Sequence, residues 1–316
     1  MDAWSRFWRQ GHTTTFGDYF EEGYAGPVKD WLESLRSTLG LVEDGSLRVV
    51  ELCCGNGSLV PFLVSLSHPF VYTGVDAANV SLPSMVRDAA THSQGSVEML
   101  PNTPVEQLPE SITGVDCCLS IYGIEYSELQ ITLSRMRERM SADGRLFALL
   151  HHQDSIVARM SRRAVSEFHA RDIGLVEDAL STIQGALQRV GSVSALKTDP
   201  QSEQARKFMN GMANKYIKGA TLKAGNAFMA DHVLAALRFF KLLGEKPRVR
   251  EQFISDLREE ANAALERHQQ MVAVAKDASD MQNLTTTMAA MGWSEVETQE
   301  LTDKDDIIGW TLTAKA

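Results

Sequence analysis

Residues 49–57 read Val49-Val50-Glu51-Leu52-Cys53-Cys54-Gly55-Asn56-Gly57, and this segment is the strongest indication of the fold. It begins inside an apolar run, 47–52, that predicts a buried strand, and it precedes the apolar pattern of a helix at 59–66. Glycines at such a junction let the backbone approach a ligand closely, and the N-terminus of the next helix offers unpaired N–H groups. The spacing differs from the GxGxxG pattern of a pyrophosphate loop, and Glu51 favours a ligand with a cationic or hydroxyl-bearing part.

A second apolar run, 70–75, predicts another strand and closes at Asp76. A carboxylate at the end of the second strand can accept hydrogen bonds from both ribose hydroxyls of a nucleoside. Asp76 follows Gly55 at close to the roughly 20 residues that are typical of nucleotide-binding sheets. A single acid after a strand is more often a turn residue or a helix cap, but the neighbouring glycine loop favours the ribose role.

Strand and helix patterns alternate as far as His151. Further strands are expected at 96–100, 115–121 and 145–151, with helices at 81–90 and 128–140 between them. This alternation predicts a parallel sheet with helices on both faces. Two last strands, at 295–301 and 308–314, are joined by a short polar turn and predict an antiparallel hairpin. The predicted fold class is α/β, a Rossmann-like, mostly parallel seven-stranded sheet with an antiparallel C-terminal hairpin.

A large all-helical insertion interrupts this pattern. From about 156 to 285 only helical periodicity is present, and one of its apolar stripes consists of Val176, Leu180, Ile183, Leu187 and Val190. We therefore expect three parts: 1–155 with an N-terminal helical and aromatic segment and the core, 156–285 with the insertion, and 286–316 with the strand pair that completes the core. The insertion is expected to be a cap over the acceptor side of the sheet or a dimer interface, and the pattern leaves both roles open.

These motifs resemble those of the class I S-adenosylmethionine-dependent methyltransferases. The segment 51–57 is similar to the first motif of that family, with Cys54, Gly55 and Gly57 matching and Cys53 in place of its first glycine. The resemblance covers about residues 40–155 and 286–316, and it implies S-adenosyl-L-methionine as the cofactor. The cofactor-binding residues that it implies are Glu51, Cys53, Gly55, Asn56, Gly57, Asp76, Ala77, Val105, Glu106 and Ser120.

The acceptor is expected outside the C-terminal ends of the fourth and fifth strands, beside the sulfonium of the cofactor. A hydroxyl acceptor needs a base, and a histidine has a suitable pKa. The candidate catalytic residues are His151, His152 and Glu125, and a hydrogen-bonded structural role is the alternative for each histidine. The substrate pocket is expected to include Tyr122 and Tyr126, together with Tyr19 and His12 of the N-terminal segment, which is interpreted as a lid or as surface packing.

Composition indicates the class of acceptor and the cellular compartment that we expect. The formal net charge of −10 disfavours nucleic acid, so we expect a small-molecule acceptor. No signal-peptide pattern is present, and no apolar run approaches the roughly 20 residues that span a bilayer, so we expect a cytoplasmic protein without a membrane partner. Two adjacent cysteine pairs, 53–54 and 117–118, lack metal-ligand spacing; we expect four reduced thiols, each pair straddling the sheet, and no metal.

The sequence thus predicts an enzyme of the EC 2.1.1 type. It transfers a methyl group from S-adenosylmethionine to an oxygen or nitrogen of a small molecule, and S-adenosylhomocysteine is the other product. A homodimer through the helical insertion is one arrangement that fits the pattern. Two alternatives stay open: a non-catalytic S-adenosylmethionine-binding or scaffold protein and, less favoured by the charge, a nucleic-acid methyltransferase.

Overall fold

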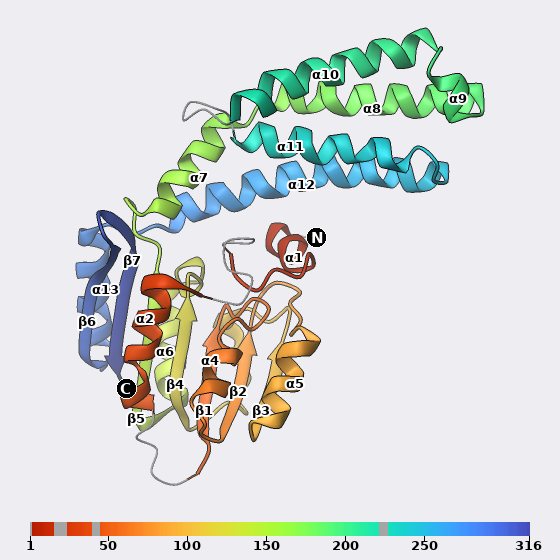
Figure 1. Cartoon of the computed structure of the whole chain (residues 1–316). Coiled ribbons are helices and arrows are strands. Elements are labelled where there is room, and N and C mark those ends of the chain that lie inside the picture. The colour runs from red at the N-terminus through yellow and green to blue at the C-terminus, as the bar shows by residue number, and fades with distance from the viewer. Residues whose placement is uncertain (1, 16–23, 40–44, 221–226) are drawn as a thin grey trace. The chain divides into compact units, whose positions relative to one another are not determined.

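The computed structural model describes residues 2–15, 24–39, 45–220 and 227–316 (Figure 1). The chain divides into two compact units, one formed by Met1–Met160 with Gln270–Ala316 and the other by Ser161–Gln269. The helical unit is shorter at both ends than the 156–285 expected from the sequence. The C-terminal difference arises because Met281 and Met288 of helix α13 (Ala278–Ala290) are buried in one cluster with residues of the sheet.

Within the described residues, seven strands form one sheet in the order β3-β2-β1-β4-β5-β7-β6. The strands β1 to β5 pair in parallel, whereas β7 pairs antiparallel with both β5 and β6. Their bounds are Leu47–Leu52, Phe70–Val75, Gly95–Leu100, Val115–Ile121, Met140–Leu150, Ser294–Asp303 and Asp306–Lys315 for β1 to β7. The predicted Rossmann-like sheet with a C-terminal antiparallel hairpin is confirmed.

Helices connect the strands as the alternation predicts, with shifted ends. The helix expected at 81–90 begins only at Ser84, because Pro83 disfavours helical backbone at Leu82. In the first unit the helices are α1 (Ala3–Trp8), α2 (Gly26–Ser34), α3 (Arg36–Leu39), α4 (Val60–Ser65), α5 (Ser84–His92), α6 (Leu129–Arg139) and α13. Short 3₁₀ turns occur at Val105–Gln107 and Ile124–Tyr126.

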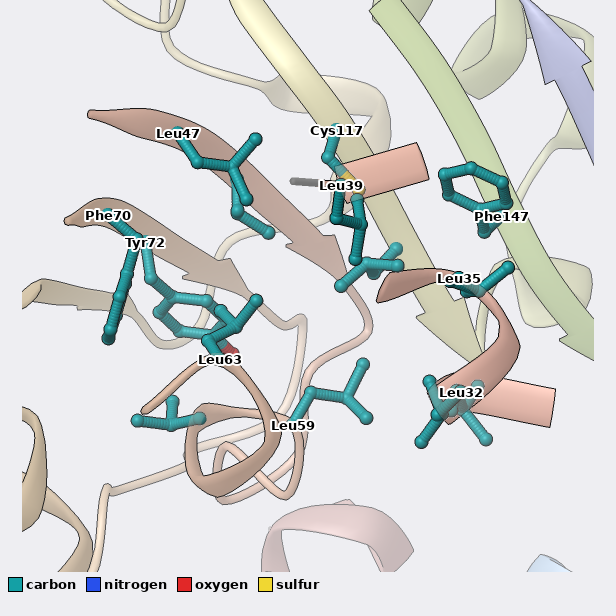
Figure 2. Packing of buried hydrophobic residues seen from close by; sticks show 14 of the residues in the cluster. Leu32, Leu35, Leu39, Leu47, Leu59, Leu63, Phe70, Tyr72, Cys117 and Phe147 are labelled. Carbon is teal, nitrogen blue, oxygen red and sulfur yellow. The ribbon is translucent and has the colours of Figure 1, made fainter. Parts of the chain in front are cut away.

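Alternate residues of each strand face opposite sides of the sheet. The side that carries Phe70 and Tyr72 of β2 packs against α2, α3 and α4, and Figure 2 shows this cluster from close by. The opposite side packs against α6 and α13. Cys117 lies in the first cluster and Cys118 in the second, so this pair straddles the sheet as predicted. All four cysteines of the chain are free thiols.

The second unit consists of helices. These are part of α7 (Ile156–Glu167), α8 (Ala170–Val190), α9 (Val193–Leu196), α10 (Pro200–Ala220), α11 (Ala227–Leu237), the 3₁₀ turn Arg238–Leu242 and most of α12 (Pro247–Val274). Its core is the buried stripe of α8 packed against α10, α11 and α12. At the start of α10 the Asp199 carboxylate accepts a hydrogen bond from the Ser202 N–H at 2.9 Å, which satisfies a free donor of that helix end. Among the described helices, none combines the length and apolar character needed to cross a bilayer.

Candidate functional site

A cavity of about 630 Å³ lies at the C-terminal ends of β1, β2 and β4, and every residue that lines it belongs to the first unit. This volume falls within the roughly 300–1,000 Å³ of small-molecule sites. One side, here called the loop wall, follows β1, β2 and β3 and consists of Cys53, Asp76, Ala77, Ala78, Val105 and Glu106. The aromatic residues of the lining, here called the aromatic wall, are Trp4, Trp8, Tyr122 and Tyr126.

Asp76 is held in place at the end of β2 by the backbone. The Gly55 N–H donates to its Oδ2 at 2.8 Å, and the Ala78 N–H donates to its Oδ1 at 2.7 Å. Burial raises the pKa of this carboxyl to about 6, against the lowering effect of those two hydrogen bonds. Because each carboxylate oxygen can accept two hydrogen bonds, Asp76 keeps capacity for two more donors, such as the hydroxyls of a ribose. The acid therefore fits the nucleoside that the sequence predicts.

Helix α1 packs against the glycine loop, Gly55–Gly57, that follows β1. Gly55 has a φ of +51°, and a Cβ added there would lie 2.5 Å from the ring of Trp8. The amide of Asn56 donates to the carbonyls of Trp8 and His12, each at 2.8 Å, and its oxygen accepts from the Ser81 N–H at 3.0 Å. Asn56 and Gly57 do not line the cavity; Asn56 instead fastens α1 beside it, so the N-terminal helix becomes part of the site.

Cys53 occupies the turn after β1 in the left-handed region, with a φ of +56°. This conformation costs a residue with a Cβ roughly 1–2 kcal/mol. Its place beyond the last residue of the strand shows that the pair 53–54 does not straddle the sheet, so that prediction was wrong for these two cysteines. A Cβ added at Gly123 would lie 2.5 Å from the Cβ of Cys53, so glycine is required where the two loops meet at the cavity.

Two other predicted cofactor residues are turned away from the cavity. The Tyr72 hydroxyl donates to Glu51 Oε2 at 2.5 Å inside the core, and burial raises the pKa of Glu51 to about 8. The Ser120 hydroxyl donates to the carbonyl of Leu52 and accepts from the Ile124 N–H, both at 2.9 Å. The Tyr72 contact joins β2 to β1, and the Ser120 contact with Leu52 joins β4 to β1. A direct role of Glu51 or Ser120 in cofactor binding stays a prediction.

Behind the aromatic wall lies a buried polar group. The Tyr126 hydroxyl and His151 Nε2 are 3.2 Å apart, and the His151 N–H donates to Glu125 Oε1 at 2.8 Å. Burial lowers the pKa of His151 to about 3 and raises that of Glu125 to about 7. Within the described residues, His151 Nδ1 and Glu125 Oε2 are buried and have no hydrogen-bond partner. Neither residue lines the cavity, but His151 stands one contact behind a residue that does.

The remaining predicted site residues are spread out. His152 stacks on Trp310 of β7 with ring centroids 4.8 Å apart, and its Nδ1 accepts from the Asp154 N–H at 2.9 Å. His12 stacks on Phe7 at 4.4 Å, outside the lining of the cavity. Tyr19 lies outside the described residues. Of the four predicted substrate residues, Tyr122 and Tyr126 line the cavity.

Sequence reasoning missed the contribution of helix α12. Gln270, Ala273 and Val274 at its end line the cavity, and the Trp4 indole N–H donates to Gln270 Oε1 at 2.7 Å. The spacing of these three residues places them on one helical face. Such spacing predicts that the face packs against another part of the chain, but it does not indicate which part. The spacing of Trp4 and Trp8, four residues apart, was a comparable signal in α1.

No protein-family model matches the chain, and no curated protein sequence matches it. Solved structures do match it at the level of the fold. The chain resembles class I S-adenosylmethionine-dependent methyltransferases in fold.

Three of these structures illustrate the likeness. The Burkholderia thailandensis 1,6-didemethyltoxoflavin N1-methyltransferase, solved with that compound and S-adenosylhomocysteine, is 18% identical over 41% of this chain and 54% of its own, with a TM-score of 0.32. The geranyl diphosphate C-methyltransferase of Streptomyces coelicolor A3(2) is 14% identical over 42% and 52%, with a TM-score of 0.33. The CMeT domain of the citrinin polyketide synthase is 13% identical over 95% and 57%, with a TM-score of 0.42. The chain thus spans little more than half the length of each.

Proposed function

We propose that this protein is an S-adenosylmethionine-dependent methyltransferase that acts on an oxygen or nitrogen of a small molecule. The observation that carries the proposal is Asp76. It lines the cavity at the end of β2, is 8% exposed, and is fixed by two backbone N–H groups with capacity left for two further donors. A nucleoside is the ligand that such a fixed, strand-end carboxylate suits.

The loop wall would hold the cofactor. Asp76 and Ala77 would bind the ribose, Val105 and Glu106 would lie along the adenine edge, and Cys53 would approach the methionine part. For Gly55 and Gly57, which do not line the cavity, a direct role in cofactor binding stays a prediction. When bound, S-adenosylmethionine supplies a methyl group on a positively charged sulfur. The aromatic wall and α12 would exclude water from that group, which strengthens electrostatic contacts inside the cavity.

The acceptor would lie against Tyr122 and Tyr126. Transfer forms a bond between the acceptor atom and the methyl carbon while the carbon–sulfur bond breaks, with its electron pair remaining on sulfur. Burial keeps the His151 ring neutral, so His151 can accept a hydrogen bond from the Tyr126 hydroxyl and fix the Tyr126 ring in the wall of the cavity. Glu125, whose pKa is raised to about 7, lies behind the aromatic wall without lining the cavity, so its role as the base stays a prediction. For His152 we propose the structural role at β7.

Ligand identification by mass spectrometry and calorimetry test this function. We expect S-adenosylmethionine and S-adenosylhomocysteine to bind and to raise the melting temperature, because a ligand of the native state stabilises it. Release of S-adenosylhomocysteine with a library of small acceptors then separates an enzyme from a scaffold that only binds the cofactor. Tight binding of NAD with none of S-adenosylmethionine would contradict the proposal.

We propose that the helical unit Ser161–Gln269 is either a cap that acceptor turnover requires or a dimer interface remote from the chemistry, the two roles expected from the sequence. Since the lining of the cavity belongs to the other unit, cofactor binding should survive replacement of this unit by a Gly/Ser linker. Loss of turnover with cofactor binding retained indicates the cap. Retained turnover in a protein that has become monomeric indicates the dimer interface. We also propose a cytoplasmic location, since a reducing compartment maintains free thiols such as these four.

A further inference from the structure

The aromatic wall contains a corner of two rings at nearly a right angle. The ring centroids of Trp4 and Tyr126 are 5.5 Å apart and their planes meet at 83°. Each ring is held in place, because the Trp4 indole donates to Gln270, which also lines the cavity, and the Tyr126 hydroxyl contacts His151 behind the wall. Trp8 extends the wall, with its centroid 6.5 Å from that of Trp4. The corner therefore exists before any ligand arrives.

The charged side chains that line the same cavity are carboxylates. Asp2 lies with α1 at the exposed margin, whereas Asp76 and Glu106 belong to the loop wall. Among the described lining residues there is no lysine, arginine or histidine. An anionic group brought here would lose its water and meet like charge, and burying an uncompensated charge is costly. A cationic group would meet opposite charge and the negative faces of aromatic rings.

We propose that the acceptor is an amine, and that the corner formed by Trp4 and Tyr126 binds its positively charged nitrogen. The proposal rests on the methyltransferase function and names its substrate class. An ammonium first loses one proton to solvent, and its lone pair then forms the bond to the methyl carbon while the carbon–sulfur bond breaks. The product is a methylated ammonium, so the corner and the carboxylates favour the charge of both substrate and product. Acceptors with a phosphate or carboxylate next to the reacting atom are disfavoured.

Binding of simple probes tests the charge preference without a known acceptor. Choline carries a quaternary nitrogen, and 3,3-dimethylbutan-1-ol is its neutral isostere; 3,3-dimethylbutanoate supplies a matched anion. Calorimetry with saturating S-adenosylhomocysteine should show choline binding about 10- to 30-fold more tightly than the alcohol, since a desolvated cation–π contact is worth up to about 2 kcal/mol. The anion should bind more weakly than both. Equal or tighter binding of the alcohol or the anion would overturn the proposal.

Variants locate the effect at the corner. Tyr126→Leu and Trp4→Leu should each reduce choline affinity toward that of the alcohol while changing alcohol affinity little. Tyr126→Phe and Trp4→Phe keep a ring and should retain most of the preference, which also controls for folding. Equal losses for both probes in the leucine variants would contradict a role in charge recognition. Cofactor binding is measured by its own titration, and its failure would count against the methyltransferase proposal. The probe titrations are also repeated without S-adenosylhomocysteine, so that the ranking of the probes is obtained independently of cofactor binding.

Discussion

The loop wall and the aromatic wall face the same cavity but are held in place by different kinds of contact. On the loop wall, Asp76 is fixed by backbone N–H groups of neighbouring loops, with both carboxylate oxygens paired. On the aromatic wall, Trp4 and Tyr126 come from distant parts of the chain and hold each other through their rings. Behind that wall, Glu125 and His151 each keep a buried atom that has no partner in the described chain. Backbone hydrogen bonds thus hold the acid of the loop wall, whereas side-chain packing holds the aromatic wall and leaves unpaired polar atoms behind it.

The largest expected effect concerns the buried acid behind the aromatic wall. The pKa of Glu125 is raised from 4.5 to about 7, so the native state holds a proton that the unfolded chain releases between these values. Its contribution to stability is full below pH 4.5 and is lost as the pH rises through about 7. The free energy of unfolding should therefore fall by about 3 kcal/mol over this interval through Glu125 alone.

Glu125→Gln should remove that part of the pH dependence. Urea denaturation of both proteins from pH 4.5 to pH 8 measures it, and the difference between the two curves isolates Glu125 because Glu51 and Asp76 titrate in both. Parallel curves would show that the pKa of Glu125 is the same in the native and the unfolded protein, and the two walls would then not differ in their electrostatics.

The next effect removes the acid of the loop wall. Asp76→Ala deletes a charged acceptor for two ribose hydroxyls, so S-adenosylmethionine should bind more weakly by about 1.5–3 kcal/mol, or roughly 10- to 150-fold. Calorimetry measures the affinity. Asp116→Ala is a matched control, because Asp116 also lies at a strand end, where it accepts hydrogen bonds from the Arg48 N–H and the Ser141 hydroxyl. Unchanged affinity in the Asp76 variant would refute the ribose assignment.

A smaller effect is expected where the two walls are joined. Asn56→Ala removes two hydrogen bonds that tie the N-terminal segment to the loop after β1 and a third from the Ser81 N–H, so the free energy of unfolding should fall by about 1–3 kcal/mol. Tryptophan fluorescence during urea denaturation follows the change, since Trp4 and Trp8 belong to α1. Asn283→Ala, at an exposed position of α13, is the control and should change the free energy of unfolding little. If both variants behave alike, Asn56 does not fasten α1.

The smallest effect tests the strain in the loop wall. Cys53→Gly relieves a left-handed conformation that costs roughly 1–2 kcal/mol, but glycine gives back roughly 0.5–1 kcal/mol in backbone entropy. The variant should be more stable by about 0.5–1 kcal/mol in chemical denaturation. Cys54→Gly, at a buried residue without a positive φ, should be less stable than the parent protein. A destabilised Cys53→Gly would mean that the thiol contributes more through packing than the conformation costs.

The sequence predicted the loop wall better than the aromatic wall, and the reason is physical. Leu47–Leu52 and Asp76 belong to local patterns of strand, turn and acid, which the chain encodes within a few residues of each other. The contact of Trp4 with Gln270 joins residues 266 positions apart, so no local pattern reports it. The left-handed turn at Cys53 was missed because a cysteine gives no signal for a positive φ. The burial of His151 beneath Tyr126 likewise depends on how the ends of β4 and β5 pack.

The attachment of α1 to the glycine loop has a practical consequence for handling the protein. Asp2 lines the cavity and caps α1 through the Ser5 N–H, so a purification tag fused just ahead of it would stand at the mouth of the site. Such a tag could compete with weak ligands or loosen the helix that forms part of the wall. Ala316, whose N–H donates to the Gly144 carbonyl at 2.9 Å, lies near the start of β5, whereas the cavity lies at the ends of the parallel strands. A tag placed there leaves the ligand entrance clear, and affinity measurements made with the two placements should differ for that reason.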